Sequence, residues 1–288
     1  MVLIFCFVSL IFEIIFKLMI KIDEKNFEKI NKWAFLMNAV PFLRGSFVCN
    51  SYAIGTADEK SDIDLFVVTK RNRLYTARFY MNLLFRIFRV RTYGDDVASK
   101  FCLSFFADED NLNFTSIAKR KDFYFAYWIY TLRPIINRNI HGKPVSEQII
   151  GKNFWARDLL GMTNADVQNT QLDLTFARDK FFFSNVFRKF FEIISVGFLG
   201  AFFESILRKI QIRKIRKRLK KIDRAEKINS FGKAVSSADV LLKKGILKLH
   251  ENDQRVAFRD AYISKYGDKF NEDNFISLLT LSQRSRGK

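Results

Sequence analysis

Apolar and polar positions follow two different periods along the first 110 residues. Residues 26–40 carry apolar side chains at near-helical spacing before Pro41, so this pattern predicts a helix that ends there. Residues 74–90 have the same helical spacing. Short apolar runs predict strands at residues 47–49, 62–69 and 101–106, with one helical turn at residues 52–55 between the first two strands.

Helical patterns dominate from residue 117 onward. Residues 178–222 predict either one long helix or two helices joined near Gly197 and Gly200. A more polar connection at residues 229–239 precedes a final helical stretch, and the tail from Ser282 is polar.

Two apolar stretches raise the question of a membrane contact. Residues 1–12 are uncharged and apolar. This stretch is shorter than the ~20 apolar residues that a spanning helix needs. A buried helix, an interfacial anchor and a true span remain open for this stretch. The second stretch, residues 181–207, is interrupted by charges, and it predicts an amphipathic helix that packs on the protein or lies on a membrane.

The positive charge is concentrated in two runs. The 288 residues include 49 Lys and Arg against 30 Asp and Glu, a net charge of +19. Residues 70–91 hold seven basic residues and residues 208–221 hold nine, and neither run contains an acid. Such runs are typical of partners with many negative charges, namely nucleotide phosphates, nucleic acid or an anionic membrane, although either run can also be a solvated helix face.

Composition narrows the class of protein. Apolar residues make up 49% of the chain, which excludes a disordered tail protein. The 33 Phe residues reflect either an AT-rich coding bias or a base-stacking surface. Cys6, Cys49 and Cys102 are far apart in the sequence, which argues against a disulfide framework and a cysteine zinc site and favours a reducing compartment. The two His are isolated, which argues against a histidine metal site. Metal ligands, if present, should therefore be carboxylates, which suit Mg²⁺ or Mn²⁺.

The candidate chemistry lies between residues 48 and 68. Asp62 and Asp64 are two apart on a predicted strand, so both side chains leave the same face and their carboxylates can converge. One or two divalent cations would relieve their repulsion. Upstream, the turn at Asn50 and Ser51 offers free backbone N–H groups and a hydroxyl as a phosphate cradle. The combination suits metal-assisted phosphoryl or nucleotidyl transfer.

This stretch resembles the DNA polymerase β-type nucleotidyltransferase superfamily, whose pattern is Gly-Ser, a gap, and then Asp-x-Asp or Asp-x-Glu between apolar residues. Ser51 matches the Ser, and Asp62 and Asp64 match the metal-binding acids. The resemblance covers about residues 26–106. It implies an α+β fold with a small mixed sheet and flanking helices, followed by a mainly helical C-terminal region. The expected division is an apolar segment at 1–25, a nucleotidyltransferase-like domain at 26–116 and the helical region at 117–288.

The sequence departs from the family pattern at two places. Asn50 stands where Gly is usual, although Asn tolerates positive φ better than most residues. Gly45-Ser46 is an alternative match, but it precedes the strand and lengthens the gap. The third carboxylate, which the family commonly places on a neighbouring strand, is not evident: Ser104 is the polar candidate on that strand, and Asp108, with Asp110, lies just past its end as a weaker catalytic candidate.

The resemblance implies transfer of a nucleoside monophosphate from a nucleoside triphosphate such as ATP to an unidentified hydroxyl acceptor, with release of pyrophosphate. Asp62 and Asp64 would hold Mg²⁺ or Mn²⁺, and the Asn50-Ser51 turn with Lys70, Arg71 and Arg73 would contact the phosphates. The alternatives are a catalytically weak module that binds nucleic acid or an anionic membrane through residues 208–221, and an enzyme of the antibiotic nucleotidyltransferase type. The expected location is cytoplasmic, with a peripheral position at the inner membrane face as an option.

Two further groups of side chains have open roles. Arg78, Arg86 and Arg89 form a stripe on the helix predicted at residues 74–90, which either holds an acceptor polyanion or faces solvent. An aromatic cluster follows residue 117 and is either core or a base-stacking platform; its members are Phe123, Tyr124, Tyr127 and Trp128.

Overall fold

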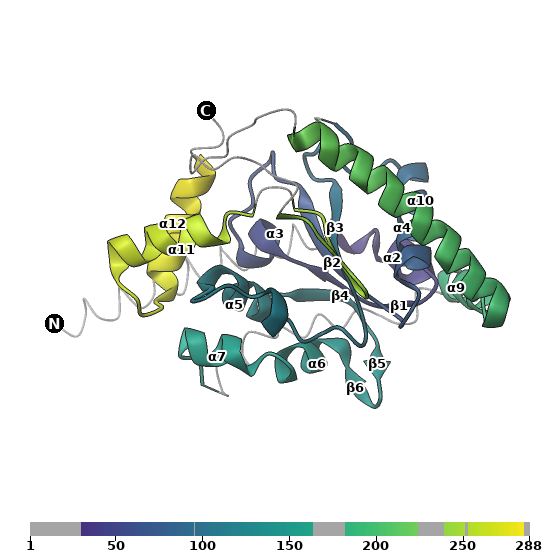
Figure 1. The fold of residues 1–288 in the computed structure, drawn as a ribbon, viewed down its shortest axis with the longest axis horizontal. Coiled ribbons are helices and arrows are strands. Elements are labelled where there is room, and N and C mark those ends of the chain that lie inside the picture. The colour runs from purple at the N-terminus through teal and green to yellow at the C-terminus, as the bar shows by residue number, and fades with distance from the viewer. Residues whose placement is uncertain (1–29, 95, 164–181, 224–238, 251–252, 285–288) are drawn as a thin grey trace, which may run out of the picture.

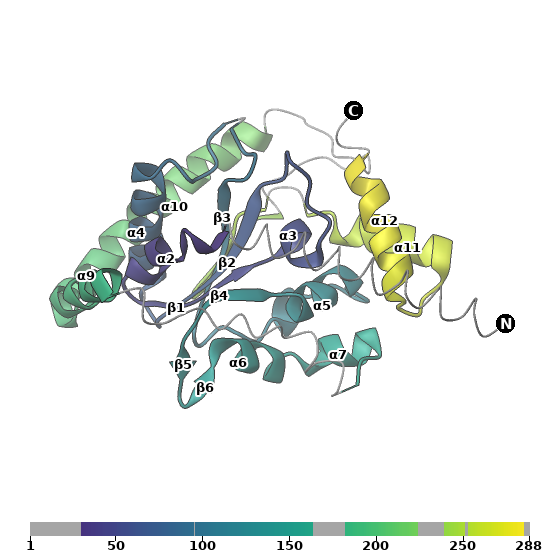
Figure 2. The same ribbon diagram turned by 180° about the vertical axis from the view of Figure 1, so that it is seen from behind.

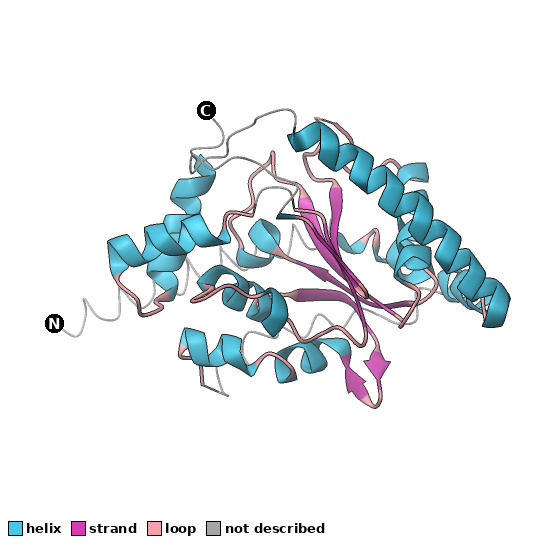
Figure 3. Cartoon of the chain, in the orientation of Figure 1, coloured by secondary structure: helices cyan, strands magenta, loops and turns pink. Residues whose placement is uncertain are grey.

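A computed structural model describes residues 30–94, 96–163, 182–223, 239–250 and 253–284. The apolar segment predicted at residues 1–25 and nearly all of the polar connection at 229–239 lie outside these described residues. Figures 1 and 3 show a twisted central sheet with helices on both faces.

The central sheet has six strands in the order β4-β1-β2-β3-β8-β7. The neighbours β2 and β3 are parallel, and every other neighbouring pair is antiparallel. The strands are β1 (Leu43–Val48), β2 (Ile63–Thr69), β3 (Phe101–Asp108), β4 (Arg133–Asn137), β7 (Leu241–Lys243) and β8 (Ile246–Lys248). A separate small hairpin consists of β5 (Asn139–Ile140) and β6 (Lys143–Pro144).

Alternating side chains of the strands bury two cores. In β2, Leu65 and Val67 face one core, whereas Phe66 and Val68 face the other. The first core lies under α2 (Ala34–Ala39), α4 (Leu74–Ile87) and α10 (Gly197–Asp223). The second lies under α5 (Phe123–Tyr130), α6 (Val145–Gly151), α7 (Phe154–Leu160), α11 (Arg255–Tyr266) and α12 (Glu272–Arg284), as the view from behind also shows (Figure 2).

The predicted α+β fold with a mixed sheet and a helical C-terminal part is confirmed. Strands β4, β7 and β8, all beyond residue 116, join the same sheet as β1, β2 and β3. The sequence pattern did not indicate this. The strand predicted at residues 47–49 is longer, since β1 begins at Leu43 and includes Gly45 and Ser46. That placement puts Gly45-Ser46 inside a strand and removes it as an alternative turn.

Helices α9, α10 and α4 correct or refine three expectations. The stretch at 178–222 forms two helices, α9 (Phe182–Ile194) and α10, and Gly197 at the start of α10 has φ 72°. Helix α4 ends at Ile87, and Arg89 has left-handed backbone with φ 55°. Of the predicted arginine stripe, Arg86 and Arg89 are exposed, but Arg78 is turned under α10 and donates to Gln211 Oε1 at 2.7 Å.

Three members of the aromatic cluster after residue 117, Phe123, Tyr127 and Trp128, are buried in the second core, which confirms the core interpretation for them, whereas Tyr124 is partly buried and also lines the cavity described below. Trp128 packs edge-on against Phe66, with ring centroids 5.2 Å apart, and is 5% exposed. Phe123 is also buried. Aromatic packing of this kind contributes about 0.5–1.5 kcal/mol per pair beyond the area that it buries.

Candidate active site

The turn after β1 has the geometry that the sequence predicted. Cys49 is extended, Asn50 has φ 56°, and the short helix α3 (Asn50–Ile54) ends at Gly55 with φ 80°. The Cys49 N–H donates to the Asp64 carbonyl at 3.0 Å, which ties the turn to the beginning of β2. Asn is one of the few residues other than Gly that adopt this left-handed conformation readily, so the turn forms without the family's Gly.

Asp62 and Asp64 converge beside this turn. Asp62 immediately precedes β2 and Asp64 lies in it, and the two carboxylates come within 4.8 Å of each other. Burial, followed by the charge of Asp62, raises the pKa of Asp64 to about 7, and burial likewise raises the pKa of Asp62. Among the described residues, no ion pair reaches either carboxylate. No cation of the described part of the chain is therefore bound directly to either carboxylate.

The side chain at the family's Gly position contacts this pair directly. Asn50 Nδ2 donates to Asp64 Oδ2 at 2.7 Å, and the Tyr124 hydroxyl donates to Asn50 Oδ1 at 3.3 Å. This chain of hydrogen bonds orients the Asp64 carboxylate and links the turn to α5. It also occupies one of the two oxygens with which Asp64 would bind a cation.

The neighbouring strand places a thiol beside the two acids. Cys102 pairs with Asp64 in the β2/β3 register, and its sulfur lies within the same 4.8 Å cluster. Burial and the nearby carboxylates raise the pKa of the Cys102 thiol, so the metal-free site keeps it protonated. The two aspartates offer hard oxygen ligands without a basic partner among the described residues, and such a donor set fits Mg²⁺ or Mn²⁺.

The structure does not bring the third predicted carboxylate to this site. Asp108 pairs with Thr69 at the far end of β2, five residues from Asp64, which corresponds to roughly 16 Å along a strand. There its Oδ1 accepts a hydrogen bond from Asn111 at 2.6 Å, and its backbone N–H donates to the Gly245 carbonyl. Asp108 therefore holds the β7–β8 hairpin in place, and its expected position at the site is corrected.

The predicted phosphate-binding cations lie at the same far end. Arg71 pairs with Asp110 at 2.9 Å, and Arg73 donates to the Ser195 carbonyl at 3.3 Å. Lys70 is exposed directly after β2. Because β2 begins at the aspartates and ends before these cations, the strand separates the two groups, and the expectation that they meet is corrected.

A cavity of about 490 Å³ opens over Ser51 and the two aspartates. This volume is in the range of small-molecule sites. Its far wall comes from segments that the sequence analysis did not connect with the site: Lys248 at the end of β8, His250, Asp253 and Arg255. The hairpin that carries Lys248 had a readable signal, since two apolar pairs flank Lys-Lys-Gly and Gly245 takes φ 75° in the turn.

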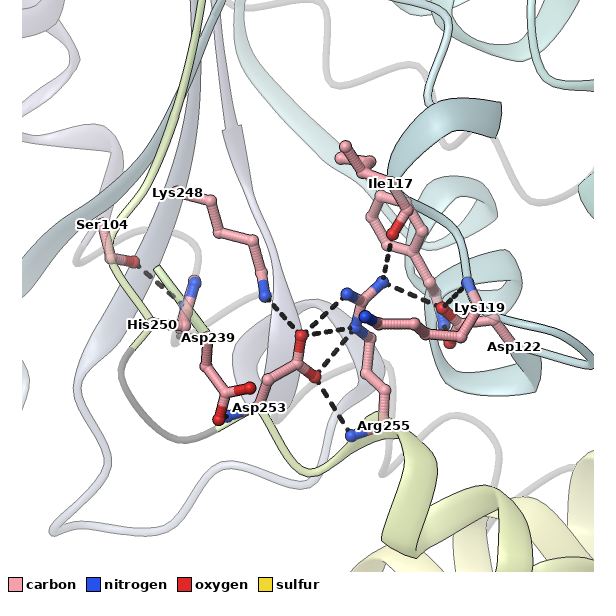
Figure 4. Close-up of polar contacts among 10 residues, drawn as sticks. Ser104, Ile117, Lys119, Asp122, Asp239, Lys248, His250, Asp253 and Arg255 are labelled. Atoms are coloured by element: carbon pink, nitrogen blue, oxygen red, sulfur yellow. Dashed lines mark hydrogen bonds and ion pairs between the residues drawn. The ribbon is translucent and has the colours of Figure 1, made fainter. Parts of the chain in front are cut away.

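The far wall is held by a buried ion-pair network (Figure 4). Arg255 donates to Asp122 at 2.8 Å and to Asp253 at 2.7 Å, and Lys248 donates to Asp253 at 2.8 Å. Burial alone would raise the pKa of Asp253, but the hydrogen bonds from Arg255 and the charge of Lys248 hold it well below its usual range. Asp253 therefore stays ionised, and the network joins β8 and α11 to the start of α5.

His250 lies beside this network and faces the neighbouring strand. Its Nε2 is 3.2 Å from Ser104 Oγ (Figure 4). Burial, assisted by the charge of Lys248, lowers the pKa of His250 to about 4, so the imidazole is neutral at physiological pH. Ser104, the polar candidate that the sequence placed on this strand, thus contacts a histidine, and its position contributes no third carboxylate.

Comparison with known proteins agrees with this geometry. Residues 45–119, about a quarter of the chain, match the family model of the nucleotidyltransferase domain. The match includes the turn at Ser51, both aspartates and Cys102. No curated protein and no solved structure matches the chain. Residues 45–119 are therefore similar to the nucleotidyltransferase domain, and this similarity is consistent with the polymerase β-type superfamily.

Proposed function

We propose that this protein transfers a nucleoside monophosphate from a nucleoside triphosphate, ATP among them, to a hydroxyl acceptor, with Mg²⁺ or Mn²⁺ held by Asp62 and Asp64. The observation that carries the proposal is the convergence of two carboxylates, without a basic partner among the described residues, beside the Ser51 turn in a cavity of about 490 Å³. A bound divalent cation would neutralise phosphate charge and polarise the α-phosphate for displacement of pyrophosphate.

The remaining roles follow from the lining of the cavity. Ser51 presents its hydroxyl and the backbone of the turn to a phosphate group. Lys60 on the rim and Lys248 in the far wall supply positive charge in place of the cations that the sequence suggested. Tyr124 and Phe258, whose ring centroids are 5.7 Å apart, give the base an aromatic surface.

The proposal is tested by incubating the full chain with each nucleoside triphosphate and either metal, and by measuring pyrophosphate release and transfer of α-phosphate label. Candidate acceptors are the protein itself, RNA and small hydroxyl compounds. Turnover that requires metal and stops on chelation is expected. Absence of label and pyrophosphate with every nucleotide and acceptor would contradict the proposal.

A second candidate, a domain that binds nucleotide without turnover, is favoured by Asn50 and Cys102. Asn50 occupies an oxygen of Asp64, and a thiol stands beside the acids instead of a third carboxylate. The two candidates differ in one measurement. A binding domain would show metal-dependent stabilisation by nucleotide in thermal unfolding, with no pyrophosphate released.

Replacing Cys102 by Asp should raise the rate of transfer with Mg²⁺ at least tenfold. The register places residue 102 opposite Asp64, so the new carboxylate would join the cluster, where an added acid can bind metal and accept the acceptor's proton. Mg²⁺ should also raise the melting temperature of this variant more than that of the wild type, since it relieves a third like charge. Cys102→Ser is the matched control, because it removes the thiol without adding charge; equal rates for the two variants would contradict the argument.

A further inference from the structure

Helices α9 and α10 dock on the protein through several polar side chains, and α10 also buries Leu207 and Ile215 in the first core. In α9, Ser184 accepts a buried hydrogen bond from Asn38, and Glu192 accepts the Phe42 N–H at 2.8 Å. In α10, the Glu204 carboxylate accepts the backbone N–H groups of Tyr75 and Thr76, at the N-terminus of α4. Glu192 and Glu204 are thus turned toward the body of the protein, where they complete backbone hydrogen bonds.

The opposite side of the same helices is apolar and exposed. Phe183 is 87% exposed in α9, and Phe198 is 83% exposed in the first turn of α10. In α9 and the first turns of α10, this is the reverse of an ordinary surface helix, whose apolar stripe faces the core; farther along α10, Leu207 and Ile215 do face the core. We call this surface the apolar corner; its most exposed members are Phe183, Phe190, Ile193, Val196, Phe198 and Leu199.

Basic side chains continue directly from the apolar corner along α10. All nine Lys and Arg of residues 208–221 are exposed, and no acid interrupts them. Several line a shallow groove along the helix, among them Arg213, Arg216 and Lys217. An exposed apolar surface that continues into a purely basic one has the chemistry of a surface that binds anionic lipid, in which acyl chains receive the apolar groups and headgroups receive the cations.

The shape of the helix pair suits the surface of a bilayer. Within the described chain, no single helix is long and apolar enough to cross a membrane, whereas residues of α9 and α10 pass that test only as a pair bent by 98°. Figures 1 and 2 place this pair at the end of the molecule away from α11 and α12. Its bend lies near Arg73 and Phe42, at the end of β2 opposite the aspartates, so the cavity would remain open to solvent when the corner is bound.

We propose that the apolar corner and the basic run of α10 bind the protein peripherally to an anionic lipid bilayer. The apolar side chains insert at the boundary between the headgroups and the acyl chains, and the cations of α10 contact the anionic headgroups. This proposal does not depend on the proposed catalytic function. An RNA or a second copy of the chain would use only part of the surface: RNA has no need of the aliphatic corner, and a second identical copy would bring its basic run against this one.

The test is flotation of the full chain with vesicles of phosphatidylcholine alone and with 30% phosphatidylglycerol. The wild type should bind the anionic vesicles at least tenfold better than the neutral ones, and binding should weaken as salt rises. Two variants should each lower binding at least tenfold. One removes apolar side chains of the corner (Phe198→Ser with Leu199→Ser), and the other reverses charges of the basic run (Arg213→Glu with Arg216→Glu and Lys217→Glu).

Matched controls change the same residue types elsewhere on the surface. Phe154→Ser with Tyr93→Ser removes two exposed aromatic side chains, and Lys119→Glu with Lys143→Glu and Lys152→Glu reverses three exposed charges. Both controls should bind as the wild type does. Failure of the wild type to float with anionic vesicles, or binding that survives both corner and basic-run variants, would overturn the proposal. The proposal would also be overturned if the wild type were a dimer in solution and Phe198→Ser with Leu199→Ser made it a monomer without changing its binding to vesicles.

Discussion

Asp64→Asn is expected to abolish nucleotidyl transfer and, at the same time, to stabilise the metal-free protein above pH 7. The loss of activity should be at least a thousandfold, because the substitution removes one of the two carboxylates that meet beside Ser51. The gain in stability follows from the same burial. An ionised Asp64 has no basic partner among the described residues, whereas an amide carries no charge that burial would penalise.

The pH dependence of this gain has a definite sign. The pKa of Asp64 is raised from 3.8 to about 7, so the folded protein holds the proton more tightly than the unfolded chain does. The free energy of unfolding of the wild type therefore falls as the pH rises between about 4 and 7, and stays lower above that range. The advantage of Asp64→Asn should be on the order of 1–2 kcal/mol at pH 8 and should vanish near pH 4.

Thermal unfolding in chelator at pH 4.5, 6 and 8, combined with the pyrophosphate assay, measures both effects. Asp110→Asn is the matched control, since Asp110 is an exposed acid at the other end of the sheet. It should leave activity and the pH profile of stability unchanged. A destabilised Asp64→Asn at pH 8 would show that Asp64 has a structural partner, and full activity would remove it from the mechanism.

Arg255→Leu is expected to lower the free energy of unfolding by about 3 kcal/mol. It leaves Asp122, whose side chain is fully buried, and Asp253, which is 8% exposed, without their shared guanidinium. Removing one partner of a buried ion pair costs more than the pair itself contributes, because the remaining charge stays in a poorly solvated place. The melting temperature should fall by roughly 10 °C.

Arg259→Leu is the control for this substitution, because Arg259 lies one turn later on α11 and pairs with the exposed Asp260. It should cost less than about 1 kcal/mol, as exposed pairs do. The double variant Arg255→Leu with Asp122→Asn should recover part of the lost stability by removing one stranded charge. Equal losses for Arg255→Leu and Arg259→Leu would show that the network contributes no more than a surface pair.

The aspartate pair and the turn at Asn50 could be predicted from the residue types and their short spacing in the sequence. Asp62 and Asp64 share a face because side chains alternate in a strand, and Asn50 takes positive φ because its side chain permits it. Both properties depend on neighbours within a few residues. Lys70, Arg71 and Arg73 also follow closely in sequence. They lie beyond the end of β2, however, whereas the aspartates lie at its beginning, so proximity in sequence was misleading there.

The far wall of the cavity could not be predicted from local pattern. Lys248 and His250 come from a hairpin about 180 residues after the aspartates, and they reach the site because β8 pairs with β3. The same pairing places His250 against Ser104 and uses Asp108 to support the hairpin turn. Which strands become neighbours depends on long-range burial and hydrogen bonding, which a short sequence window does not contain.

The sequence by itself determined the turn at Asn50 and Ser51, the pair of acids and the concentration of positive charge in two runs, since each follows from residue type and short spacing. Only the tertiary structure decided what surrounds them. It put a thiol where a third acid was expected and moved the first basic run away from the cavity. It also turned Glu192 of α9 and Glu204 of α10 inward, so that the apolar side of the bend faces out. The physical reason is that strand pairing and helix docking are chosen by the burial of the whole core, not by any single segment.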